Sequence, residues 1–89
     1  MKVCKRCHVS GKVQGVFFRA ATRDRAQSLH VTGYAKNLDD GRVEVLACGE
    51  AKDVDELIDW LWEGSSGARV DRVDVEDADE DAPQDFRML

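Results

Sequence analysis

The sequence predicts an α+β fold, a split β-α-β sandwich in which one antiparallel sheet carries two helices on one face. Three observations lead to this prediction. A strand–helix–strand pattern occurs twice along the 89 residues. The connections are short, and crossovers between strands of one sheet are right-handed. Each element has an apolar face with the period of a half-buried strand or an amphipathic helix. In this topology the first and third strands are antiparallel neighbours at the sheet centre.

The first strand is expected over residues 2–10, where side chains of two kinds alternate along the chain. The inner parity carries the apolar residues Val3, Cys7 and Val9, with Lys5 as a discordant charge. The outer parity carries Cys4, Arg6, His8 and Ser10. A helix is expected over residues 16–31, because core-forming residues recur there at the spacing of one helix face. These residues are Phe18, Thr22, Ala26 and Leu29.

Residues 32–38 and 42–48 are expected to form a β-hairpin, because the tight-turn sequence Asp39-Asp40-Gly41 joins them. One face of the second of these strands carries Val43, Val45 and Ala47. The other face carries Glu44, Leu46 and Cys48.

The second helix is expected to begin at a capping box, with Asp53 as the N-cap and Glu56 three residues later. An apolar stripe follows at positions i, i+3, i+4 and i+7. It consists of Val54, Leu57, Ile58 and Leu61, flanked by Trp60 and Trp62. Gly64 is a typical residue to end the helix.

The last part of the chain predicts a fourth strand over residues 68–75, with Val73 and Val75 on the inner face and Val70 out of register. Residues 76–85 are acidic, contain the only proline, and are expected to be a surface loop. Residues 86–89 are expected to add a short terminal strand.

The composition excludes several classes of protein. The net charge of −5 argues against broad binding of nucleic acid or anionic membranes, which requires a basic surface. There is no signal peptide and no apolar run long enough to span a membrane, so a cytoplasmic protein is expected. No surplus apolar face requires a partner, and a monomer is expected. The 12 Asp against 6 Glu fit an ordinary acidic surface or adaptation to high salt.

The three cysteines raise the alternatives of a metal site, a haem attachment site and a disulfide. Cys4-Lys5-Arg6-Cys7-His8 has the spacing of a haem attachment site, but residues three apart in a strand face opposite sides. The same geometry disfavours zinc, and Cys7 is expected in the core. Cys4 and Cys48 both lie on outer parities, and the predicted topology places them opposite each other. They are therefore either two reduced thiols or a disulfide.

The stretch GKVQGVFFR at residues 11–19 joins the first strand to the first helix. A glycine-containing loop that leads into a helix N-terminus has free backbone N–H groups and favours anions. Arg19 adds a planar cation with several donors, which suits phosphate. Asn37 ends the second strand at the same end of the sheet, within reach of that anion. Alternatively, Gly15 and Asn37 are ordinary turn residues and Arg19 is a solvated helix residue.

These motifs resemble the acylphosphatase family. The similarity includes residues 11–19, the stretch GYAKNLDDG at residues 33–41, residues 43–45 and residues 68–70. It implies a ferredoxin-like fold in a single acylphosphatase-like domain over residues 1–89. It also implies hydrolysis of the carboxyl-phosphate bond of small acyl phosphates to carboxylate and inorganic phosphate, without metal or cofactor.

The resemblance also implies roles for individual residues. Arg19 and Asn37 are the catalytic residues, with Arg19 binding the phosphate and Asn37 orienting the attacking water. The substrate's own phosphate oxygen accepts the proton. The phosphate-binding loop comprises Gln14, Gly15, Val16, Phe17, Phe18 and Arg19. Phe17 stands where the family often has a small residue, and this difference can narrow or reshape the pocket.

Two other classes of function are alternatives to a hydrolase. An RNA-recognition domain of the same topology stacks bases on aromatic residues of its open sheet face, and the outer positions of the central strands hold no aromatic pair. A carbamoyl-phosphate-handling domain of a larger maturation factor can share the two motifs. Hydrolysis of a simple aryl acyl phosphate, with Asn37→Ala as the control, separates a hydrolase from a binding module.

Overall fold

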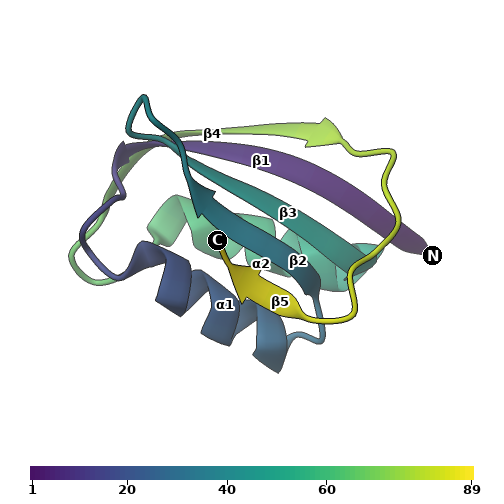
Figure 1. Cartoon of the computed structure of the whole chain (residues 1–89). Coiled ribbons are helices and arrows are strands. Elements are labelled where there is room, and N and C mark those ends of the chain that lie inside the picture. The colour runs from purple at the N-terminus through teal and green to yellow at the C-terminus, as the bar shows by residue number, and fades with distance from the viewer.

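A computed structural model describes all residues from 1 to 89 and contains one five-stranded sheet with both helices against one face (Figure 1). The elements are β1 (Lys2–Lys12), α1 (Phe18–Ser28), β2 (Thr32–Asn37), β3 (Val43–Glu50), α2 (Ala51–Glu63), β4 (Arg69–Asp77) and β5 (Phe86–Met88). The strand order is β4-β1-β3-β2-β5. All neighbours are antiparallel except β2 and β5, which makes the sheet mixed. The predicted sandwich, including the terminal strand, is confirmed.

The core lies between the sheet and the two helices, as the predicted parities require. Cys7 and Val9 of β1 are fully buried, and so are Val43, Val45 and Ala47 of β3. The predicted apolar stripes of the two helices pack against these strand residues. The most buried residues of the stripes are Phe18, Thr22, Ala26, Val54, Leu57 and Leu61. Neither helix combines the length and apolar content needed to cross a bilayer.

Helix α1 begins at Phe18, two residues later than predicted, because the chain turns sharply before it. Phe17 has φ 58° and ψ 24°, in the left-handed region, and cannot be part of a right-handed helix. Its carbonyl accepts the first helical bond, from the Ala21 N–H at 3.0 Å. Val16 and Phe17 therefore belong to the loop between β1 and α1.

The predicted capping box of α2 is wrong. The helix begins at Ala51 directly after β3, and no side chain caps it. Instead, the Ala51 N–H donates to the Met1 carbonyl at 2.9 Å, and the Met1 amino group contacts Glu50 at 2.9 Å. Asp53 lies in the first turn, where a carboxylate interacts favourably with the helix dipole. Contacts with Met1, the residue before β1, thus replace the side-chain cap.

A β-bulge explains why Val70 is out of register with Val73. Ser10 of β1 pairs with Arg72, whereas Gly11 pairs with Val70, so Asp71 is an extra residue in β4. The extra residue reverses the parity, and both valines pack against the core. Val75, predicted to face inward, is 44% exposed because β4 is an edge strand.

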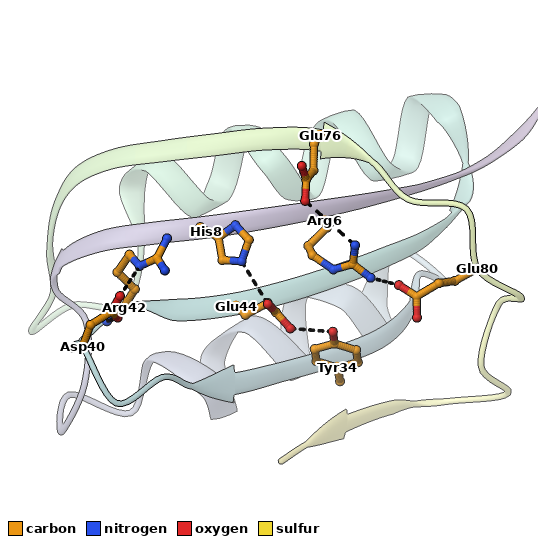
Figure 2. Close-up of polar contacts among 8 residues, drawn as sticks. All are labelled: Arg6, His8, Tyr34, Asp40, Arg42, Glu44, Glu76 and Glu80. Carbon is orange, nitrogen blue, oxygen red and sulfur yellow. Dashed lines mark hydrogen bonds and ion pairs between the residues drawn. The ribbon is translucent and has the colours of Figure 1, made fainter.

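The face of the sheet opposite the helices carries a polar cluster, shown in Figure 2. Glu44 lies at its centre, with Oε1 at 2.9 Å from His8 Nε2 and Oε2 accepting the Tyr34 hydroxyl at 2.6 Å. Arg6 is paired with Glu76 and Glu80. Partial burial opposes ionisation of Glu44, but the hydrogen bonds with Tyr34 and His8 outweigh it and lower the pKa of this carboxyl.

Acid is therefore expected to destabilise the protein through Glu44. The pKa of Glu44 in the folded state lies below its ordinary value of 4.5. Its contribution to stability is fully present above that pH and is lost as pH falls through the folded-state pKa. A hydrogen bond to a charged group contributes about 1.5–3 kcal/mol. Urea unfolding of wild type and Glu44→Gln should show a stability difference near neutral pH that shrinks as the pH falls below 4.5.

The variant Tyr34→Phe is the matched control for this prediction. It keeps the ring and removes one donor to Glu44, so the loss of stability on acidification should be smaller and should be complete at a higher pH than in wild type. If wild type and both variants lost stability in parallel between neutral and acid pH, Glu44 would have no part in the acid sensitivity.

The pairing of Cys4 with Cys48 agrees with the predicted geometry. The two residues are register partners in β1 and β3 and form a disulfide. Cys7, three residues from Cys4, lies in the core on the other face of the sheet, and burial raises the pKa of its thiol to about 12. The Cys-x-x-Cys-His sequence is therefore split between two faces of the sheet.

Candidate active site

The loop from β1 to α1 presents unpaired backbone donors. The N–H groups of residues 15–20 have no hydrogen-bond acceptor within the protein. Gly15 has φ 75°, and a Cβ at this position would meet nothing within 4 Å. The glycine is therefore required by the backbone conformation rather than by crowding, and the space beside it is open to a ligand. Consecutive free N–H groups at a helix N-terminus form a cradle for an anion.

Side-chain hydrogen bonds fix this loop from two sides. Gln14 Nε2 donates to the carbonyls of Leu38 at 2.8 Å and Arg42 at 3.0 Å, which connects the loop to the β2–β3 hairpin. On the other side, Ser65 Oγ donates to the Val16 carbonyl at 2.8 Å. Figure 1 shows that the β1–α1 loop, the β2–β3 turn and the α2–β4 loop lie at one end of the sheet.

The hairpin itself is stabilised at its turn. Asp40 accepts hydrogen bonds from the Arg42 backbone N–H at 3.1 Å and from Arg42 Nε at 2.8 Å (Figure 2). These hydrogen bonds lower the pKa of the Asp40 carboxyl. The turn holds the Leu38 and Arg42 carbonyls where Gln14 meets them, and so fixes Asn37 relative to the loop.

A pocket of about 450 Å³ lies where the loop, α1, the end of β2 and the end of β5 meet. Its polar lining comes from Gly15, Arg19 and Asn37. Its apolar lining comes from Val13, Phe17, Phe18, Ala20 and Met88. The two predicted catalytic residues, which are 18 positions apart in the sequence, thus line one pocket.

The guanidinium of Arg19 retains free donors in this pocket. Nη1 donates to the main-chain oxygen of Leu89 at 2.6 Å, which is the only hydrogen bond of this side chain within the protein. Nε and Nη2 carry none. Arg19 is half-buried on the first turn of α1, directly after the loop with the free N–H groups. The donors and the positive charge can therefore act on the same anion.

Asn37 contributes an unpartnered acceptor. Its Oδ1 is shielded from solvent and is the one buried side-chain nitrogen or oxygen in the protein that lacks a hydrogen-bond partner. Leaving such a group unpaired costs about 1–3 kcal/mol. Buried polar groups without a partner are rare in native proteins, and a functional role is one reason for retaining them.

The predicted phosphate-binding residues divide into two groups in the structure. Gly15, Phe17, Phe18 and Arg19 line the pocket. Gln14 and Val16 do not line it, and they instead hold the loop through the contacts described above. Sequence reasoning missed Met88 of β5, because only the parallel pairing of β5 with β2 brings it beside the end of β2.

A larger cavity, of about 670 Å³, lies at the other end of the sheet and is lined in part by the disulfide and by residues 80–83. Its charged lining residues include Lys2, Asp77 and Glu80, of which Asp77 is paired with Lys5 and Glu80 with Arg6. It contains neither Arg19 nor Asn37. The smaller pocket is therefore the candidate active site.

Comparison with known proteins supports the same conclusion. A family model described as acylphosphatase matches residues 5–88. An acylphosphatase of Chromohalobacter salexigens is 53% identical over 85 residues, which cover 96% of this chain and 94% of that protein. One of Halorhodospira halophila is 58% identical over 83 residues, covering 93% and 90% of the two chains. The structure of an acylphosphatase from Coxiella burnetii superposes with a TM-score of 0.95 at 45% identity, covering 99% and 93% of the chains. The chain therefore belongs to the acylphosphatase family and is a hydrolase of acyl phosphates.

Proposed function

We propose that Arg19 and the N–H groups of residues 15–20 bind the phosphoryl group of an acyl phosphate, and that Asn37 orients the attacking water. The observation that carries this proposal is the unpartnered Asn37 Oδ1 in the pocket that Arg19 lines. An amide can accept a hydrogen bond from a water and donate another. Asn37 is therefore suited to orient a nucleophile beside the group that Arg19 holds.

The reaction requires little beyond positioning and charge stabilisation. Water oxygen attacks phosphorus, and the bond from phosphorus to the acyl oxygen breaks. The carboxylate leaves with the electron pair, and it is a good leaving group. Holding the phosphoryl group while placing a water in line with that bond supplies most of the catalysis in phosphoryl transfer.

The proton of the attacking water goes to a phosphoryl oxygen of the substrate in this proposal. The lining of the pocket includes no His, Asp or Glu that could act as a general base. An asparagine amide does not accept a proton at neutral pH. With the proton on its oxygen, inorganic phosphate is the second product beside the carboxylate, and the reaction balances without a protein base.

Replacing Asn37 by alanine is expected to lower kcat by about 100- to 1,000-fold with little change in KM, since the side chain acts on the water and not on the bound phosphate. The measurement is steady-state hydrolysis of benzoyl phosphate in the presence of a metal chelator. Thermal unfolding checks that the variant folds, and no loss of stability is expected because Oδ1 has no partner to lose.

Lys36→Ala is the matched control, because Lys36 is exposed and is the neighbour of Asn37 on the same strand. It should keep wild-type kinetics. Turnover at the wild-type rate by Asn37→Ala would disprove the proposed role of this side chain.

A further inference from the structure

Phe17 combines two properties that the fold does not explain. Its side chain is 85% exposed, although phenylalanine is normally buried. Its backbone has φ 58°, in the left-handed region that side chains other than glycine and asparagine rarely adopt. The next residue, Phe18, is 1% exposed and packs on Trp60 with ring centroids 5.9 Å apart. Phe17 has no such role in the core.

The loop requires the backbone conformation at Phe17 but not its side chain. Glycine or asparagine would adopt the same turn at lower free-energy cost. The left-handed conformation is unfavourable for other residues because it brings Cβ too close to the following carbonyl oxygen. Since the ring adds no buried contact to the fold in return, its position at the pocket indicates a contact with the ligand.

The lining of the pocket has a polar part and an apolar part, and this division indicates which part of a ligand Phe17 contacts. Its polar residues can hold a phosphoryl group, and its other lining residues are apolar. Met88, 40% exposed, provides a second apolar side chain, and Arg23 Nη1 donates to its Sδ at 3.2 Å. An acyl phosphate has the same division, with its charge on the phosphoryl group and its variable part in the acyl group.

We propose that Phe17 is a specificity-determining residue that contacts the acyl group and selects aromatic and larger alkyl acyl phosphates over short or charged ones. The inference rests on the proposed function, because that function places the phosphoryl group at Arg19. A flat ring beside the acyl group gains contact area with an aromatic or alkyl chain. A methyl group reaches too little of the ring to gain the same stabilisation.

The test compares benzoyl phosphate with acetyl phosphate as substrates. Phe17→Ala is expected to lower kcat/KM for benzoyl phosphate by about 10-fold and for acetyl phosphate by less than about 3-fold. Phe17→Leu should retain part of the preference. Competitive inhibition by inorganic phosphate should be unchanged in both variants, since the ring does not contact the phosphoryl group.

Trp62→Ala is the matched control, because Trp62 is also an exposed aromatic residue, 52% exposed, and does not line the pocket. It should leave both substrates unaffected. Equal losses for both substrates, or no loss for either, would overturn the role of Phe17. The proposed function fails separately, by undiminished turnover of both substrates in Asn37→Ala.

Discussion

Replacement of Arg19 by lysine is expected to lower kcat/KM for acyl phosphates by about 100- to 1,000-fold, although the positive charge is kept. One nitrogen of the guanidinium already donates to the Leu89 oxygen, and Nε and Nη2 remain free. The N–H groups of Nε and Nη2 lie in the plane of the guanidinium and can donate side by side to two phosphoryl oxygens. A lysine ammonium is a point charge on a flexible stem and cannot make both the Leu89 contact and this bidentate contact in the same geometry.

Arg19→Ala should lower kcat and raise KM together, because the loss includes the charge that holds the substrate. Inhibition by inorganic phosphate should weaken in both Arg19 variants. Arg25→Lys, on the exposed side of the same helix, is the matched control and should retain wild-type kinetics. Activity of Arg19→Lys within about threefold of wild type would show that charge alone is sufficient and that the planar geometry has no role.

The sequence was sufficient to predict which side chains of each central strand face the core. Alternation in β1 and β3 separates Cys7 and Val45, which are buried, from Cys4 and Glu44, which are on the other face. The physical reason is that strand side chains have a period of two, so one buried face determines the other. The same topology predicted that the loop after β1 and the end of β2 lie together, where Arg19 and Asn37 are found in one pocket.

Features that depend on contacts between distant segments could not be predicted in this way. The α2 start depends on a hydrogen bond from Ala51 to Met1, and local propensity alone favoured Asp53. The role of Gln14 depends on carbonyls of the hairpin, and that of Met88 on β5 lying beside β2. A capping pattern or a loop glycine gives information only about residues close to it in the sequence.

Reduction of the Cys4–Cys48 disulfide is expected to lower the melting temperature substantially. The two cysteines are 44 positions apart, and closing a loop of that length restricts the unfolded chain by about 2–4 kcal/mol. For a domain of this size, such a change corresponds to roughly 10–25 °C. Thermal unfolding with and without dithiothreitol measures the shift. The double variant Cys4→Ser/Cys48→Ser should match the reduced protein and should not respond to the reductant.

Activity below the melting temperature should be unaffected by reduction, because the disulfide and the pocket are at opposite ends of the sheet. The eight register pairs between β1 and β3 do not require the cross-link, so the two strands should stay paired after reduction. Cys7 should not exchange with the disulfide in the folded protein, because thiol exchange requires the thiolate and burial raises the pKa of the Cys7 thiol to about 12. Three titratable thiols in unreduced protein that has been unfolded, together with a melting temperature insensitive to dithiothreitol, would contradict the disulfide. A fall in kcat on reduction would instead show that the two ends of the sheet are coupled.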